Sequence, residues 1–183
     1  MGVNVNKNDY QSRMADRFAA FDRDKDGSVT AADFEAMASK ILAEFDERKE
    51  SDKGKALLDG AQQFWRNLCK VVDASGDERI TEQEFVEAAV NRLLNNPDGF
   101  TEIVRPWAKA VVAVADTDDD GTVDTQEWAR MLQTMGADPD AARQRAADMD
   151  LNRDGTVSVD EVIASAVDAF TSENPRYEPV WAR

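Results

Sequence analysis

DTDDDGTVDTQE, at residues 116–127, is the stretch of sequence that decides the fold. Oxygen-bearing side chains alternate at its positions 1, 3 and 5, a glycine stands at position 6, and a glutamate closes it at position 12. Alternating short acids can wrap most of the way around one hard cation, and calcium takes about six to eight oxygens in this way. Glycine at position 6 allows the positive φ of a sharp turn without a Cβ clash. The stretch therefore predicts a calcium-binding loop.

The same pattern occurs four times in the chain. The copies, named loops 1 to 4, occupy residues 22–33, 73–84, 116–127 and 150–161. Each has a β-branched apolar residue at position 8 and a carboxylate at position 12. This is the pattern of the EF-hand loop, in which position 7 contributes its backbone carbonyl. One such stretch alone could be a solvated turn between helices, but four copies in register are not explained that way. The calcium-binding repeats of β-helices are a second alternative, and they are excluded because they recur about every nine residues.

Loops 3 and 4 have complete sets of candidate ligands, and loop 1 departs from them only at its last position. These ligands are Asp22, Asp24, Asp26, Ser28, Thr30 and Asp33 in loop 1; Asp116, Asp118, Asp120, Thr122, Asp124 and Glu127 in loop 3; and Asp150, Asn152, Asp154, Thr156, Ser158 and Glu161 in loop 4. Asp33 is one methylene shorter than glutamate and is less able to reach the ion with both oxygens. We therefore expect magnesium to compete at loop 1.

Loop 2 is the weakest candidate. Its ligand set would be Asp73, Ser75, Asp77, Arg79 and Glu84. Its glycine stands at position 4, so Glu78 must take the positive φ at position 6, at a cost of about 1 kcal/mol. The side chain of Arg79 adds a positive charge beside the site. We expect three calcium ions per chain, in loops 1, 3 and 4, and leave a fourth in loop 2 open.

The segments around the loops predict an all-α protein. Apolar residues recur at helical spacing, for example at Met14, Phe18 and Phe21 before loop 1. A single EF-hand leaves one apolar face uncovered, so we expect loop 1 to pair with loop 2, and loop 3 with loop 4, through short β-ladders at position 8. An N-terminal pair would cover residues 1–97 and a C-terminal pair residues 98–183, whose apolar tail after residue 173 should fold back. Pro106 is a point where a helix could bend or begin.

The composition excludes several classes of function. The 37 Asp and Glu against 22 Lys and Arg give a formal charge of -15, which would repel nucleic acid and anionic membranes. The absence of histidine removes the commonest general base, and no catalytic constellation is present, so we expect no enzyme. The lone Cys69 and a polar N-terminus point to the cytoplasm. No apolar run is long enough to span a membrane, and we expect a monomer.

Together the four loops resemble those of the sarcoplasmic calcium-binding proteins, including their bacterial calerythrin-like relatives. The resemblance rests on the closing Asp33 followed by Phe34, the wide gap before loop 2, the irregular loop 2 and the two regular last loops, and it covers residues 10–171. It implies that both EF-hand pairs pack as one compact globule, unlike the dumbbell of calmodulin-like sensors. It also implies calcium buffering or transport, with one silent site, for which loop 2 is the candidate.

Three roles are consistent with calcium binding. A buffer binds the ion with little change of surface, whereas a sensor exposes an apolar groove to a target protein. A third role, as a relative of the luciferin-binding proteins, would require a cavity for a hydrophobic chromophore. The methionines are scattered along the sequence, whereas a sensor groove typically gathers them, so the buffer is favoured.

Overall fold

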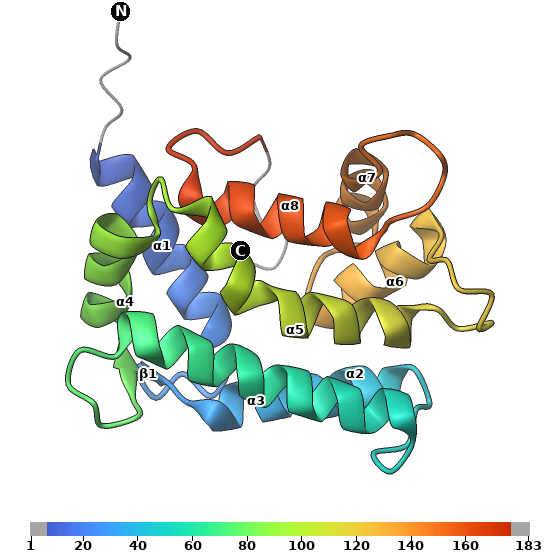
Figure 1. Ribbon diagram of the computed structural model, residues 1–183, viewed down its shortest axis with the longest axis horizontal. Helices are drawn as coiled ribbons and strands as arrows, with labels where there is room; N and C mark the ends of the chain where they lie inside the picture. Colours follow the sequence, from blue (N-terminus) through green and yellow to red (C-terminus); the bar gives the residue numbers. More distant parts are fainter. Residues whose placement is uncertain (1–6, 177–183) are drawn as a thin grey trace, which may run out of the picture.

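Four helix–loop–helix units follow one another in the computed structural model, which describes residues 7–176 (Figure 1). Each loop lies between an entering and an exiting helix, as the apolar periodicity predicts. In chain order the elements are α1 (Lys7–Phe21), β1 (Ser28–Val29), α2 (Ala31–Glu44), α3 (Asp52–Val72), β2 (Ile80–Thr81), α4 (Glu82–Ala88), the π-helical η1 (Ala89–Leu93), α5 (Pro97–Ala115), α6 (Thr125–Met135), α7 (Pro139–Met149) and α8 (Val159–Thr171). The expected all-α fold is confirmed.

The loops pair as expected, through their position-8 residues. β1 and β2 run antiparallel, with Val29 opposite Ile80 and Ser28 opposite Thr81. In the C-terminal half the backbone N–H of Val157 donates to the carbonyl oxygen of Val123 at 2.7 Å, beside an antiparallel bridge. All four position-8 side chains are buried. Their burial fixes the register, because a slip of one residue would turn these side chains out to solvent.

The two halves share one core. α3 packs along α5, α5 packs against α8, and α2 contacts α6, so each half covers apolar surface of the other (Figure 1). The ring of Phe21 lies 5.6 Å from that of Phe34, 6.3 Å from that of Phe64 and 6.1 Å from that of Phe170 in α8. The compact single-globule packing implied by the family resemblance is therefore present.

One glycine sets how closely two helices from different halves approach. A Cβ atom on Gly60 of α3 would lie 3.0 Å from the carbonyl oxygen of Pro106 in α5 and 3.0 Å from the Cβ of Ala110. Pro106 neither ends nor starts a helix, because α5 continues through it to Ala115. α5 instead begins at Pro97, where the side chain of Asn96 accepts the N–H of Gly99.

Two further features bear on the sequence predictions. No helix among residues 7–176 is long and apolar enough to cross a membrane. Most of the C-terminal tail that was expected to fold back, residues 177–183, lies outside the described residues.

Candidate metal centres

The acid at position 12 ties the two ends of each loop together. In loop 3, Oε1 of Glu127 accepts the backbone N–H of Thr117 at 2.9 Å, and Oε2 accepts that of Asp124 at 3.1 Å. Glu161 of loop 4 accepts the N–H of Leu151 at 2.8 Å and that of Ser158 at 2.9 Å in the same way. The closing carboxylate therefore faces the inside of the loop and also caps the first turn of the exiting helix.

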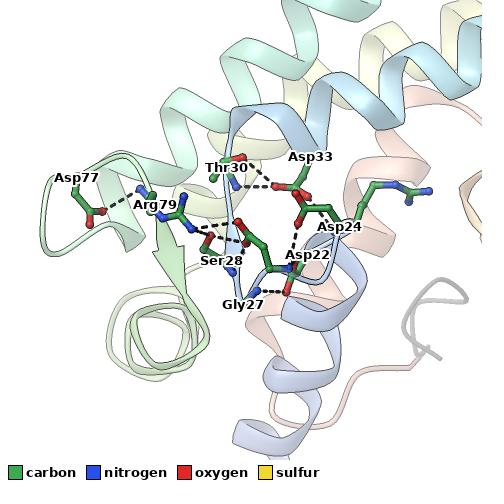
Figure 2. Close-up of polar contacts among 10 residues, drawn as sticks. Asp22, Asp24, Gly27, Ser28, Thr30, Asp33, Asp77 and Arg79 are labelled. Atoms are coloured by element: carbon green, nitrogen blue, oxygen red, sulfur yellow. Dashed lines mark hydrogen bonds and ion pairs between the residues drawn. The ribbon is translucent and has the colours of Figure 1, made fainter.

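Asp33 forms the same pair of contacts despite its shorter side chain. Its Oδ1 accepts the N–H of Arg23 at 3.0 Å, and its Oδ2 accepts the N–H of Thr30 at 2.9 Å (Figure 2). These donors stand at positions 2 and 9, the positions that Glu127 contacts in loop 3. The side chain of Asp33 is buried. Loop 1 has therefore closed around the shorter acid, and its preference between calcium and magnesium stays a prediction.

One oxygen of the position-1 aspartate accepts the N–H of the glycine at the loop turn. Oδ2 of Asp22 accepts the N–H of Gly27 at 3.0 Å, and Oδ2 of Asp116 accepts that of Gly121 at 3.1 Å. Oδ1 of Asp116 is buried and has no hydrogen-bond partner among the described residues. A buried carboxylate oxygen without a donor is costly unless a cation neutralises it. This orphaned oxygen fits a calcium ligand.

Carboxylates converge in loops 1 and 3. Oxygens of Asp22, Asp24 and Asp33 lie within 4.8 Å of one another, as do oxygens of Asp116, Asp118 and Asp120. Negative charges held this close repel one another unless a cation lies between them. An oxygen-only set of this kind suits a hard divalent ion such as calcium.

The position-5 aspartates are held in their charged form by the residue at position 7. The hydroxyl of Ser28 donates to Asp26 and lowers the pKa of that carboxyl, and Thr122 has the same effect on the pKa of Asp120. The pKa of Asp154 is lowered likewise by the hydroxyl of Thr156. These carboxylates are therefore ionised at neutral pH, as metal ligands must be.

Loop 2 keeps the backbone shape of the other loops by a different distribution of glycine. Glu78 takes φ 60° at position 6, as expected, and Gly76 takes φ 75° at position 4. In the other loops glycine stands at position 6 and a non-glycine residue takes the positive φ at position 4, as Lys25 does with φ 60°. Each loop thus has one non-glycine residue with positive φ, so Gly76 offsets the strain that we assigned to Glu78.

The side chain of Arg79 lies on loop 1, although its sequence position suggested a charge beside loop 2. Its Nη2 donates to Oδ2 of Asp26 at 3.2 Å and to the hydroxyl of Ser28 at 2.5 Å (Figure 2). Within loop 2, Arg79 uses only its backbone N–H, which donates to Asp77 at 3.0 Å. Sequence reasoning missed this contact; the available signal was the position-8 pairing, which brings the two loops side by side.

A second basic residue contacts loop 3 from a distant part of the chain. Nζ of Lys53, in the first turn of α3, donates to the carbonyl oxygen of Asp116 at 2.6 Å and pairs with Asp119 at 2.5 Å. Asp119 stands at position 4, which supplies no ligand in the EF-hand pattern. Lys53 therefore anchors loop 3 without engaging its ligand carboxylates.

The comparisons with known proteins agree with this geometry. The family described as "EF-hand domain pair" matches residues 11–90, and that described as "EF hand" matches residues 113–132 and 147–164. The solved structure of a Streptomyces coelicolor calcium-binding protein, described as acting in prokaryotic calcium-mediated regulation, is 42% identical, with a TM-score of 0.82 over 88% of this chain and 98% of that one.

Two curated relatives are more distant. Calerythrin of Saccharopolyspora erythraea is 25% identical over 85% of this chain and 89% of its own length. A sarcoplasmic calcium-binding protein of Hediste diversicolor is 28% identical over 70% of this chain and 71% of its own. The coelenterazine-binding protein of Renilla muelleri, 22% identical with a TM-score of 0.66 over 99% of this chain and 96% of that one, shares the fold.

Proposed function

The chain belongs to the EF-hand family, in the branch of calerythrin and the sarcoplasmic calcium-binding proteins, and from this premise we propose that it binds calcium ions and buffers their free concentration. The observation that carries the proposal is the convergence of Asp116, Asp118 and Asp120 in loop 3, together with the orphaned Oδ1 of Asp116. That arrangement is costly without a cation and favourable with one.

We propose three binding loops per chain: 1, 3 and 4. In each, the side chains at positions 1, 3, 5, 9 and 12 and the carbonyl at position 7 supply the oxygens. Glutamate closes loops 3 and 4 and aspartate closes loop 1, so magnesium should compete at loop 1. Three calcium ions would bring the formal charge from -15 to -9, since each adds two positive charges. Loop 2 is the weakest site, because the hydroxyl of Ser75 stands at position 3, where the other three loops have the side-chain carbonyl oxygen of an aspartate or an asparagine.

The surface supports the buffer role. Among the described residues, Leu151 is the only large apolar side chain classed as exposed, at 49%. The aromatic rings of α1, α2, α3 and α8 are packed into one core that both halves share. A protein of this shape has little apolar surface to offer a target.

A sensor role is the second candidate, because three of the six methionines gather at one place in the fold. Met37, Met135 and Met149, from α2, α6 and α7, all line one apolar cavity of about 100 Å³. Scatter along the sequence therefore does not keep these three side chains apart in space. Opening of this cavity would present a methionine-rich groove of the kind that accommodates target helices. The cavity is smaller than the roughly 300–1,000 Å³ of ordinary ligand pockets, so we do not propose a luciferin-type ligand.

Calorimetric titration tests the binding proposal. Calcium added to the metal-free protein, with and without millimolar magnesium, should give three tight sites, one of them weakened by magnesium. Two tight sites would argue against loop 1, and four equivalent sites would show that loop 2 is intact.

A fluorescent dye for apolar surface separates the two roles. A buffer should bind less dye when calcium is added, because the loaded loops tighten the packing. A sensor should bind more dye, because its groove opens.

A further inference from the structure

We propose that Arg79 of loop 2 is a tethered cation that competes with calcium for loop 1, and so determines the affinity of that site. The inference rests on the proposed function, because it requires calcium to bind at loop 1. It assigns to loop 2 a role that does not depend on loop 2 binding an ion itself.

The β-ladder places Arg79 beside loop 1. Ser28 faces Thr81 across the ladder, and alternate residues of a strand point to the same face, so residue 79 is the diagonal neighbour of Ser28. Diagonal neighbours lie about 7–8 Å apart, within reach of a long side chain. The arginine spans this gap, and its Nη2 contacts Asp26 and Ser28 together (Figure 2).

Arg79 leaves Asp26 with no free oxygen. Ser28 donates its backbone N–H to Oδ1 of Asp26 at 2.9 Å and its hydroxyl to the same atom at 2.7 Å. Oδ2 of Asp26 accepts from the guanidinium at 3.2 Å. Since position 5 is a ligand position in the EF-hand, calcium must displace one of these donors or share the carboxylate with a positive charge.

Loops 3 and 4 have no such competitor from position 7. Thr122 and Thr156 stand there, and each donates its hydroxyl to the position-5 aspartate of its own loop. Lys53, which contacts loop 3, binds a backbone carbonyl and Asp119, not a ligand carboxylate. The competition therefore weakens loop 1 selectively.

The contact should have opposite effects on the empty and the loaded protein. In the empty protein the guanidinium offsets repulsion among the acids of loop 1, so it stabilises the fold. On loading, it opposes the incoming ion. The side chains of Arg79 and Asp26 are 53% and 42% exposed, so water and salt screen the pair. An exposed pair of this kind should change the calcium affinity of loop 1 by about 2- to 5-fold.

The test compares Arg79→Gln with Lys25→Gln in the full-length chain. Lys25 is an exposed residue at position 4 of loop 1, and no ion pair joins it to the loop acids among residues 7–176. Each variant removes one positive charge near the same site, but only Arg79→Gln removes the contact with a ligand. Calcium buffered by a chelator would be titrated while the amide NMR signals of Gly27, Gly121 and Gly155 report loading of loops 1, 3 and 4.

We expect Arg79→Gln to raise the calcium affinity of loop 1 by about 2- to 5-fold and to leave loops 3 and 4 unchanged. Its melting temperature in chelator should fall by about 1–3 °C. Lys25→Gln should change the calcium affinity of loop 1 less than about 2-fold, because water and salt screen the charge that it removes. A 2-fold change corresponds to about 0.4 kcal/mol.

An unchanged or reduced affinity in Arg79→Gln would overturn the inference, because a merely structural arginine would weaken both the fold and the site. Equal gains in both variants would also overturn it, since they would reflect general charge alone. In both cases calcium binding itself would stand. If neither the wild-type protein nor the variant binds calcium at any loop, the proposed function fails, and the inference fails with it.

Discussion

Tyr10→Phe should destabilise the protein by removing a hydrogen bond that joins its first and last described helices. The hydroxyl of Tyr10 in α1 donates to the carbonyl oxygen of Phe170, in the last turn of α8, at 2.7 Å, and it lies 3.2 Å from the carbonyl oxygen of Ala89. Tyr10 is 1% exposed. The last carbonyls of a helix have no partner within the helix, so this phenol serves as the cap of α8.

The size of the effect follows from what is left unpaired. The carbonyl oxygen of Ala89 would still accept the N–H of Leu94 at 2.8 Å, so the loss of its contact with Tyr10 should cost little. The carbonyl of Phe170 would lose its tyrosine donor in a buried place, which costs about 1–3 kcal/mol. In a chain of this size each kcal/mol corresponds to about 2–4 °C, so the melting temperature should fall by about 2–12 °C.

The pH dependence gives a second and sharper measure. Burial raises the pKa of Tyr10 to about 12. A group whose pKa is raised on folding stabilises the protein below its unfolded pKa, about 10, and loses this contribution as the pH rises through its folded pKa. The stability difference between wild type and Tyr10→Phe should therefore be constant below about pH 10 and shrink between about pH 10 and 12.

Urea unfolding at a series of pH values, with calcium held constant, would measure this difference. The chain has 2 tyrosines, so the difference between the ultraviolet titrations of wild type and variant belongs to Tyr10. A loss below about 0.5 kcal/mol at neutral pH, or a Tyr10 that titrates near its ordinary pKa of about 10, would refute the capping argument.

Three further predictions concern the loops and one tight turn. Glu127→Gln and Glu161→Gln should each abolish one tight site in calorimetry, because the amide has no charge and one fewer coordinating oxygen; loss of both sites from one substitution would contradict independent closure. Asp33→Glu should raise the affinity of loop 1 for calcium relative to magnesium, and an unchanged ratio in competition titrations would count against the role of side-chain length. Gly54→Ala should lower stability in denaturant unfolding by about 1–3 kcal/mol, because the new Cβ would meet the carbonyl oxygen of Arg48 at 2.0 Å; a neutral result would show that the turn before α3 adapts freely.

The sequence by itself determined the four loops and their pairing. This was possible because an EF-hand loop is twelve contiguous residues, whose ligands, turn and helix cap are all set by local spacing. The apolar residue at position 8 then requires a partner, and the pairing of Val29 with Ile80 follows from that requirement. The start of α7 is set just as locally: the side chain of Asp138 accepts the N–H groups of Asp140 and Ala141, and proline occupies the first position of the helix.

Only the tertiary structure decided where long side chains from other elements go. Arg79 belongs to loop 2 by sequence but neutralises Asp26 of loop 1, and Lys53 contacts loop 3 from a helix more than sixty residues away. Met37, Met135 and Met149, far apart along the chain, meet around one cavity because α2, α6 and α7 pack together around it. These contacts depend on how helices from both halves pack around one core, and a long side chain reaches whatever that packing brings near, so local spacing could not predict them.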